Sequence, residues 1–196
     1  MSKFQAVIAP LVASLGVALS GAAAAQTSPG TGPYVGANIN LYSKYSLDCD
    51  AGVNCDKTPR LGGKVYGGYD FGTYAIEAFA FNAGGAKGSL RDGAISLPGK
   101  LRQDGLGVVG VLPFTTGDLT FKGKLGVAYV RGRASYAAGG SSSDKAFAPV
   151  VGAGVGYALT KTLSLNADWD QTRAEYGLHS PRTTVNMFSL GLSTKF

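Results

Sequence analysis

The chain has 196 residues, of which 15% are charged and 30 are glycine, and its 18 Lys and Arg outnumber 12 Asp and Glu. This length suits one domain, and no run of 18 apolar residues follows the N-terminus, which excludes a transmembrane helix. The basic residues are spread along the chain rather than gathered in one run, which argues against a nucleic-acid-binding protein.

The N-terminus has the pattern of a secretory signal peptide. A lysine near the start is followed by a short apolar core, Ala6–Leu19, and by alanines just before Gln26. The apolar core is too short for a membrane anchor. We therefore expect residues 1–25 to be removed on export, residues 26–31 to form a flexible leader, and residues 32–196 to form the folded domain.

Export of the chain would place its two cysteines in an oxidising compartment. Cys49 and Cys55 lie in a stretch rich in Asp, Gly and Asn, which is typical of a loop. In an oxidising compartment, two cysteines this close favour a disulfide that clips the loop. Metal binding is the weaker alternative, because no histidine is nearby.

After the leader, segments of about ten residues alternate in polarity, a length that suits a tilted strand in a membrane β-barrel. Eight such segments can be recognised. Their apolar faces are predicted to comprise Val35, Ala37, Ile39, Leu41; Leu61, Val65, Tyr69; Tyr74, Ile76, Ala78, Ala80; Leu106, Val108, Leu112; Leu119, Phe121, Leu125, Val127, Tyr129; Val151, Ala153, Val155, Tyr157; Leu163, Leu165, Ala167, Trp169; and Phe188, Leu190, Leu192, Thr194, Phe196.

The connections between these segments alternate in length. Short connections, "DFGT", "PFTTGD" and "ALTKT", lie between long polar stretches that we expect to be loops. Short turns at one end and long loops at the other are the plan of an outer-membrane barrel. The long stretches are Ser43–Arg60, Asn82–Pro98, Gly132–Lys145 and Thr172–Thr184.

The apolar faces decide between a soluble barrel and a membrane barrel. They form a nearly continuous apolar surface with aromatic residues toward its ends, and no segment is left to cover that surface as a second layer. Lipid can cover it, and a closed barrel satisfies every backbone group without water. The sequence therefore predicts an all-β fold, an eight-stranded antiparallel up-and-down transmembrane β-barrel in the outer membrane, whose last strand pairs with the first.

Several of these segments resemble the OmpA-like transmembrane domain family. The resemblance is carried by "YAIEAFAFNAGGAKG", "GKLGVAYVRGRA", "APVVGAGVGYALTKTLSLNADWDQT" and "MFSLGLSTKF", in order, over residues 32–196. It implies an eight-stranded outer-membrane barrel, here without the periplasmic peptidoglycan-binding domain. It also implies that the last strand carries the signal read by the outer-membrane assembly machinery, with Thr194 in place of the more usual aromatic. The residues of that signal are Phe188, Leu190, Leu192 and Phe196.

The polar faces should point into the lumen and form a charge network. Lys64, Glu77 and Lys124 match inward positions of the network in the resembling family, while Gly156 and Asn166 stand where that family often has Glu and Arg. The expected network residues are Lys64, Glu77, Lys122, Lys124, Asn166 and Asp168. Phe79 and Phe81 share the face of Glu77 and fit a polar lumen poorly, and a bulge after Glu77 would turn them outward.

An eight-stranded barrel has an interior that side chains can fill. We therefore expect a structural or surface-interaction protein whose lumen is largely filled by polar and charged side chains. A narrow ion-conducting pore is the alternative, because lumenal glycines leave space. A lipid A-modifying enzyme is less favoured, because His179 and its neighbour Ser180 have no carboxylate placed to orient the histidine. We expect no cofactor and no metal.

The basic residues in and beside the long stretches would lie at the level of lipopolysaccharide phosphates, with which they can pair. Ordinary loop solubility explains them equally well. We expect a monomer whose partners are outer-membrane lipid, lipopolysaccharide and the assembly machinery, with no identified surface ligand. These residues are Lys57, Arg60, Lys87, Arg91, Lys100, Arg102, Arg131, Arg133, Lys145, Arg173 and Arg182.

Overall fold

The computed structural model describes residues 31–45, 61–92, 95–136, 141–174 and 183–196. The expected signal peptide, the two cysteines and the pair His179–Ser180 lie outside these residues. Among the residues that are described, no helix is long and apolar enough to cross a membrane.

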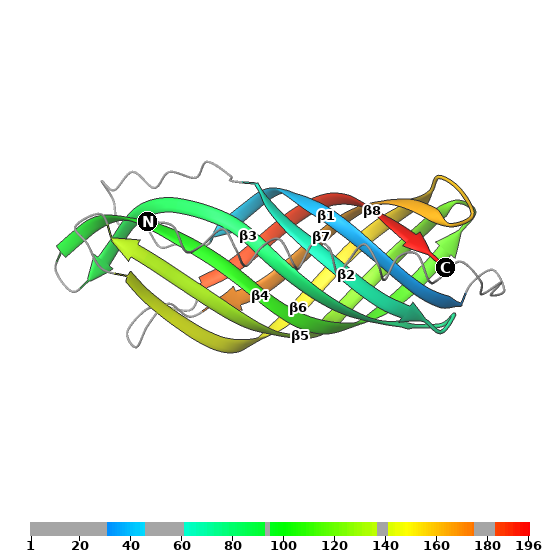
Figure 1. Ribbon diagram of the computed structural model, residues 1–196, viewed down its shortest axis with the longest axis horizontal. Coiled ribbons are helices and arrows are strands. Elements are labelled where there is room, and N and C mark those ends of the chain that lie inside the picture. The colour runs from blue at the N-terminus through cyan, green and yellow to red at the C-terminus, as the bar shows by residue number, and fades with distance from the viewer. Residues whose placement is uncertain (1–30, 46–60, 93–94, 137–140, 175–182) are drawn as a thin grey trace, which may run out of the picture.

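Eight strands close into one antiparallel barrel in chain order, which confirms the predicted fold class (Figure 1). Because each strand pairs with its sequence neighbours, the sheet has no free edge. The strands are β1 (Gly32–Tyr45), β2 (Gly62–Asp70), β3 (Ala75–Asp92), β4 (Ile95–Thr116), β5 (Leu119–Tyr136), β6 (Ser141–Ala158), β7 (Leu163–Ala174) and β8 (Thr183–Lys195).

The barrel closes where β8 pairs with β1. The register runs from Tyr34 opposite Lys195 to Tyr45 opposite Val185, with one irregularity between Asn40 and Tyr42. Phe196 adds a further bond, since its backbone N–H donates to the carbonyl of Pro33 at 3.0 Å. The closing strand is therefore paired along its whole length.

Two of the predicted loops are instead strands. The stretch Asn82–Pro98 is mostly paired, with Gly85 opposite Arg102 and Asp92 opposite Ile95. The stretch Gly132–Lys145 is paired at both ends, and Figure 1 shows the β3–β4 and β5–β6 hairpins reaching beyond the ends of β1, β7 and β8. These segments were expected to be loops because both of their faces are polar, so the apolar alternation disappears although the backbone ladder continues.

Side chains alternate between the lumen and the outer surface as the sequence pattern predicts. On β5, Lys124 is 4% exposed whereas the next residue, Leu125, is 68% exposed. Large apolar side chains such as Phe114 and Phe147 are exposed on the outer wall in the same way. In an outer-membrane barrel, this outward apolar surface is the part that lipid covers.

The bulge expected after Glu77 is absent. β3 keeps one register with β2 from Ala75 to Asn82, and the irregularity in its pairing with β4 falls between Asn82 and Gly85. Phe79 and Phe81 therefore stay on the face of Glu77 and are buried in the lumen. They are compatible with that position because the lumen is not uniformly polar.

Candidate functional site: the lumen and its two ends

The middle of the lumen is crossed by two buried ion pairs. Lys64 Nζ on β2 lies 2.7 Å from Asp170 Oδ2 on β7, and Lys124 Nζ on β5 lies 2.7 Å from Asp168 Oδ1, also on β7. In the barrel, β1 and β8 separate β2 from β7, and β6 separates β5 from β7. The two pairs therefore connect strands that are not neighbours in the sheet.

Glu77 completes this layer from β3. Its Oε1 lies 3.9 Å from Lys64 Nζ, and its Oε2 accepts a hydrogen bond from the Tyr34 hydroxyl at 3.3 Å. Lys64 Nζ also lies 5.4 Å from the centroid of the Tyr66 ring, within the range of a cation–π contact. Tyr34 and Tyr66 meet edge to face, with ring centroids 6.3 Å apart.

The amide of Asn38 donates to the second oxygen of the Asp168 carboxylate. Asn38 Nδ2 donates to Asp168 Oδ2 at 2.6 Å and to Ser189 Oγ at 3.2 Å. Asp168 thus accepts from a cation on one oxygen and from an amide on the other. A buried carboxylate held in this way is tightly positioned.

The glycines of β6 make room for these carboxylates. A Cβ added at Gly152 would lie 2.6 Å from Asp170 Oδ1, and one added at Gly154 would collide with Asp168 Oδ1. The space that the sequence suggested as a passage is therefore occupied by side chains of β7. At Gly156 an added Cβ would lie 3.0 Å from Asn166 Oδ1, so Asn166 occupies the space beside this glycine.

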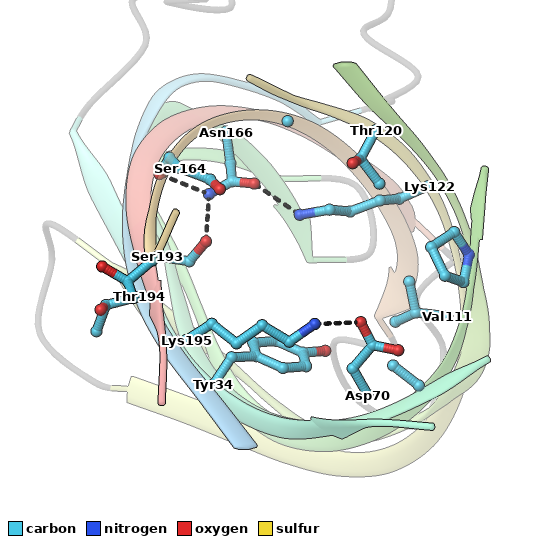
Figure 2. Close-up of a pocket in the computed structure, with 14 residues that line it drawn as sticks. Tyr34, Asp70, Val111, Thr120, Lys122, Ser164, Asn166, Ser193, Thr194 and Lys195 are labelled. Carbon is cyan, nitrogen blue, oxygen red and sulfur yellow. Dashed lines mark hydrogen bonds and ion pairs between the residues drawn. The ribbon is translucent and has the colours of Figure 1, made fainter. Parts of the chain in front are cut away.

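A cavity of about 140 Å³ opens at the end of the lumen where the short turns lie (Figure 2). Lys122 Nζ donates to Asn166 Oδ1 at 2.6 Å, and Asn166 Nδ2 donates to Ser193 Oγ at 2.8 Å. Across the mouth, Lys195 Nζ lies 2.7 Å from Asp70 Oδ2, and Figure 2 shows this pair beside the ring of Tyr34. This cavity, the vestibule, has a mixed wall in which these polar groups lie beside Ala75, Val111 and Pro113.

Many apolar side chains are buried in the lumen toward the long hairpins, together with the polar side chains of Asn40, Gln103 and Thr172. On β5, Lys122 and Lys124 are followed by Ala128 and Val130, and on β3, Glu77 is followed by Phe79 and Phe81. The expectation of a lumen largely filled by polar groups is therefore only half correct. The buried apolar cluster comprises Tyr66, Ala75, Phe79, Phe81, Ala83, Val109, Val111, Ala128, Val130, Ala148, Val150, Val185 and Met187.

The six residues expected to form the lumenal network all have side chains in the lumen. Lys64 with Glu77, Lys124 with Asp168, and Lys122 with Asn166 are brought together as three contacts. Sequence reasoning left out Asp170, the closest partner of Lys64, although its alternation with Asp168 was visible. It also missed Asn38 and Tyr34, which single-sequence alternation places inward without indicating any contact.

The lumenal charges balance among the described residues. The three lysines Lys64, Lys122 and Lys124 face the three carboxylates of Glu77, Asp168 and Asp170. Within the same part of the chain, no group of three or more His, Cys, Asp or Glu is placed to hold a metal ion.

The outer wall carries some of the other residues singled out from the sequence. Phe188, Leu190 and Leu192 are exposed on the outer face of β8, and Phe196 is half-buried. Several of the basic residues expected in or beside the loops lie on strands, with exposed or half-buried side chains. These are Arg102, Arg131, Arg133, Lys145 and Arg173.

The comparisons agree with this architecture. The model of the outer membrane protein beta-barrel domain matches residues 11–196. The chain belongs to this family, and the barrel is an outer-membrane barrel. A comparison with curated protein sequences finds no match.

Solved structures share the fold at low sequence identity. Neisserial surface protein A is 18% identical with a TM-score of 0.62, over 84% of this chain and 97% of that one. The attachment invasion locus protein Ail of Yersinia pestis is 15% identical with a TM-score of 0.56, over 86% and 100%; Ail has also been solved with the heparin analogue sucrose octasulfate. OprG of Pseudomonas aeruginosa is 14% identical with a TM-score of 0.52, over 86% and 98%.

Proposed function

We propose that this protein is a closed outer-membrane barrel with a structural and surface-interaction role, performed by its outer wall and its long hairpins. The observation that carries this proposal is the filled lumen. Ion pairs Lys64–Asp170 and Lys124–Asp168 cross its middle at 2.7 Å each, and Phe79, Phe81 and their apolar neighbours are buried in the half beyond. A solute would have to break both layers to pass.

The parts of the molecule that remain accessible support a role at the surface. The β3–β4 and β5–β6 hairpins extend past the other strands, on the side opposite the short turns (Figure 1). In outer-membrane barrels the longer connections face the outside of the cell. The Ail structure with sucrose octasulfate shows that a barrel of this fold can bind an anionic sugar, which makes a similar class of partner reasonable to test here.

The test is single-channel recording of the refolded protein in planar bilayers, with folding verified by heat-modifiable migration on gels. The expected result is a folded barrel without steady conductance steps. Steps that change with the charge reversal Lys124→Glu would show ions passing Lys124 and would contradict the closed-barrel proposal.

A narrow pore is the second candidate, and the vestibule is the observation that favours it. This cavity of about 140 Å³ is lined in part by polar groups, among them Lys122, and opens at the short-turn end. A conducting barrel would need the Lys124–Asp168 and Lys64–Asp170 pairs to exchange partners. The same recordings decide between the two candidates.

We also propose that the exposed apolar face of β8 is read during assembly, as the sequence resemblance implies. Phe188, Leu190 and Leu192 all point outward from this strand. Phe196→Ala should lower the amount of protein in outer-membrane fractions, and an unchanged amount would count against the idea. We further propose that the barrel is a monomer without catalytic activity.

A further inference from the structure

Basic side chains are clustered on the outer face of β4, β5 and β6, near the long hairpins. Arg102 lies opposite Arg133, Asp104 opposite Arg131, and Arg131 opposite Lys145. All five lie on the outer face, because they are separated from the outward residues Leu106, Tyr129 and Phe147 of their strands by two or four positions. We call Arg102, Asp104, Arg131, Arg133 and Lys145 the outer-wall cluster.

The outer-wall cluster begins where the apolar surface ends. On β5, the outward residues from Leu119 to Tyr129 are apolar or glycine, and Arg131 is the next outward residue. These ten steps rise roughly 24 Å, at about 3.4 Å a residue and a tilt of about 45°. An outer-membrane barrel has an apolar band about 25 Å tall. Arg131 therefore lies at the level of the lipid headgroups.

The charges of the outer-wall cluster do not balance. Four cations surround one carboxylate, and Asp104 already binds Arg131, with Nη2 and Nε of that arginine 2.7 and 3.1 Å from Oδ2. Arg133 Nε lies 3.9 Å from the other oxygen, Oδ1. Like charges directly opposite each other on one face of a sheet repel, as Arg102 and Arg133 must. An anion from outside would relieve this repulsion.

A groove with an apolar base accompanies the charges. It has a volume of about 350 Å³, and its lining includes Asp104, Leu106, Tyr129, Arg131 and Lys145. The rings of Tyr129 and Phe147 pack with centroids 5.1 Å apart below the charged groups, and Phe147 is 80% exposed. The surface thus presents cations on the side toward the long hairpins and an apolar aromatic pair on the side toward the middle of the wall.

We propose that the outer-wall cluster binds the phosphate groups of a phosphorylated, acylated glycolipid of the outer leaflet. Guanidinium groups match phosphate oxygens in paired hydrogen bonds, and the aromatic pair Tyr129–Phe147 contacts the acyl chains. We expect the cluster to bind lipid rather than a soluble polyanion, because its charged residues directly adjoin the apolar residues of the lipid-facing wall along the same strands. This inference deepens the proposed surface role and depends on it.

The adjoining wall of β7 and β8 provides a contrast within the same molecule. On β7 and β8, the outward residues beyond Trp169 and Phe188 are Gln171 and Asn186. Trp169 Nε1 and Gln171 Nε2 donate to the side-chain oxygen of Asn186 at 3.2 and 3.0 Å. These side chains are uncharged, and the next outward residue of β7 is Arg173, a single exposed cation, so this wall offers phosphate less positive charge than the outer-wall cluster.

The experiment compares two double variants that remove the same charge. Arg133→Gln/Lys145→Gln removes two cations of the outer-wall cluster and leaves the Arg131–Asp104 pair intact. Lys161→Gln/Arg173→Gln removes two exposed cations elsewhere on the barrel and is the matched control. Binding of fluorescent diphosphoryl lipid A and of its dephosphorylated form is measured with each refolded protein in neutral detergent micelles.

The native protein should prefer the phosphorylated lipid, and Arg133→Gln/Lys145→Gln should weaken that binding by roughly 30-fold, from the attraction expected for two basic residues near a charged membrane surface. The control double variant should bind like the native protein. Equal binding of both lipids by the native protein, which requires no variant, would overturn the inference. So would equal losses in the two variants, or competition by sucrose octasulfate stronger than that by diphosphoryl lipid A. A silent, folded barrel with any of these results would leave the closed-barrel proposal standing.

Discussion

The barrel carries cationic side chains in the lumen and on the outer wall, and the two sets differ in how completely they are paired with carboxylates. In the lumen, Lys64 and Lys124 each have a buried carboxylate at 2.7 Å, and the count of described charges is equal. On the outer wall, Arg131 and Arg133 share one half-exposed carboxylate, Asp104. The lumenal charges therefore satisfy each other, whereas those outside leave an excess.

This difference separates charged side chains that stabilise the fold from charged side chains that are available to bind a partner. A buried cation without its carboxylate is strongly unfavourable, so pairing is enforced wherever lipid and protein exclude water. At the headgroup level, water and lipid phosphates can solvate a cation, and an excess is tolerated. Changes in the lumen should therefore affect folding, and changes on the outer wall should affect binding.

The largest expected effect is the loss of Lys124. Lys124→Met leaves Asp168 buried with only the Asn38 amide as a strong donor, and should lower the free energy of unfolding by about 3–5 kcal/mol. Urea titration of the protein folded in phospholipid vesicles measures this. Lys124→Met/Asp168→Leu removes both charges and should recover most of the loss. A double variant as unstable as the single one would show that the pair is not what stabilises the lumen.

The next effect separates the two faces of β5. Leu125→Arg places a charge on the lipid-facing wall and should cost about 2–4 kcal/mol, whereas Lys124→Arg keeps its charge in the lumen and should be milder. The same vesicle titrations compare the two variants. If Lys124→Arg were the damaging change and Leu125→Arg harmless, the facing of β5 would be reversed, because a shift of one residue exchanges its two faces.

A smaller effect is expected at Lys122, the lumenal lysine whose hydrogen-bond acceptor is an amide. Its Nζ donates to Asn166 Oδ1 beside the open vestibule, so water can replace that acceptor. Lys122→Met should lower the free energy of unfolding by only about 1 kcal/mol. A loss as large as that of Lys124→Met would indicate that Lys122 belongs to the paired layer, and the contrast within the lumen would disappear.

The sequence predicted the barrel because its information lies in alternation. Pairs such as Lys124 and Leu125 differ so strongly in polarity that the facing of a strand in lipid is fixed by one or two residues. The hairpin extension from Gly85 to Arg102 was not predicted because its sequence lacks a regular alternation of apolar and polar residues, although its backbone is paired. The local sequence gives no sign that the backbone pairing of β3 with β4 continues.

The lumen was predictable only in part. Lys64, Glu77 and Asp168 could be placed inward, but the choice of Asp170 as the partner of Lys64 depends on how β2 and β7 face each other across the barrel. The apolar layer was missed because the inward residues Val109 and Val130 lie in runs that are apolar on both faces. In such runs, polarity does not distinguish the inward face from the outward face. Phe79 and Phe81 were suspected of turning outward on the assumption that a lumen must be polar throughout.

The smallest expected effect on stability concerns the outer wall. It tests most directly whether the outer-wall cations differ in role from the lumenal ones. Arg133 and Lys145 lie at the surface, so Arg133→Gln/Lys145→Gln should change the free energy of unfolding by no more than about 0.5 kcal/mol in vesicles of neutral phospholipid. Anything that binds the folded barrel but not the unfolded chain stabilises it further. Vesicles containing diphosphoryl lipid A should therefore raise the stability of the native protein more than that of the variant, whereas dephosphorylated lipid A should raise both equally. Lys161→Gln/Arg173→Gln should follow the native protein in every vesicle. A variant already destabilised in neutral vesicles would mean that the outer-wall cations support the fold as the lumenal ones do, and the distinction between the two sets of charges would not hold.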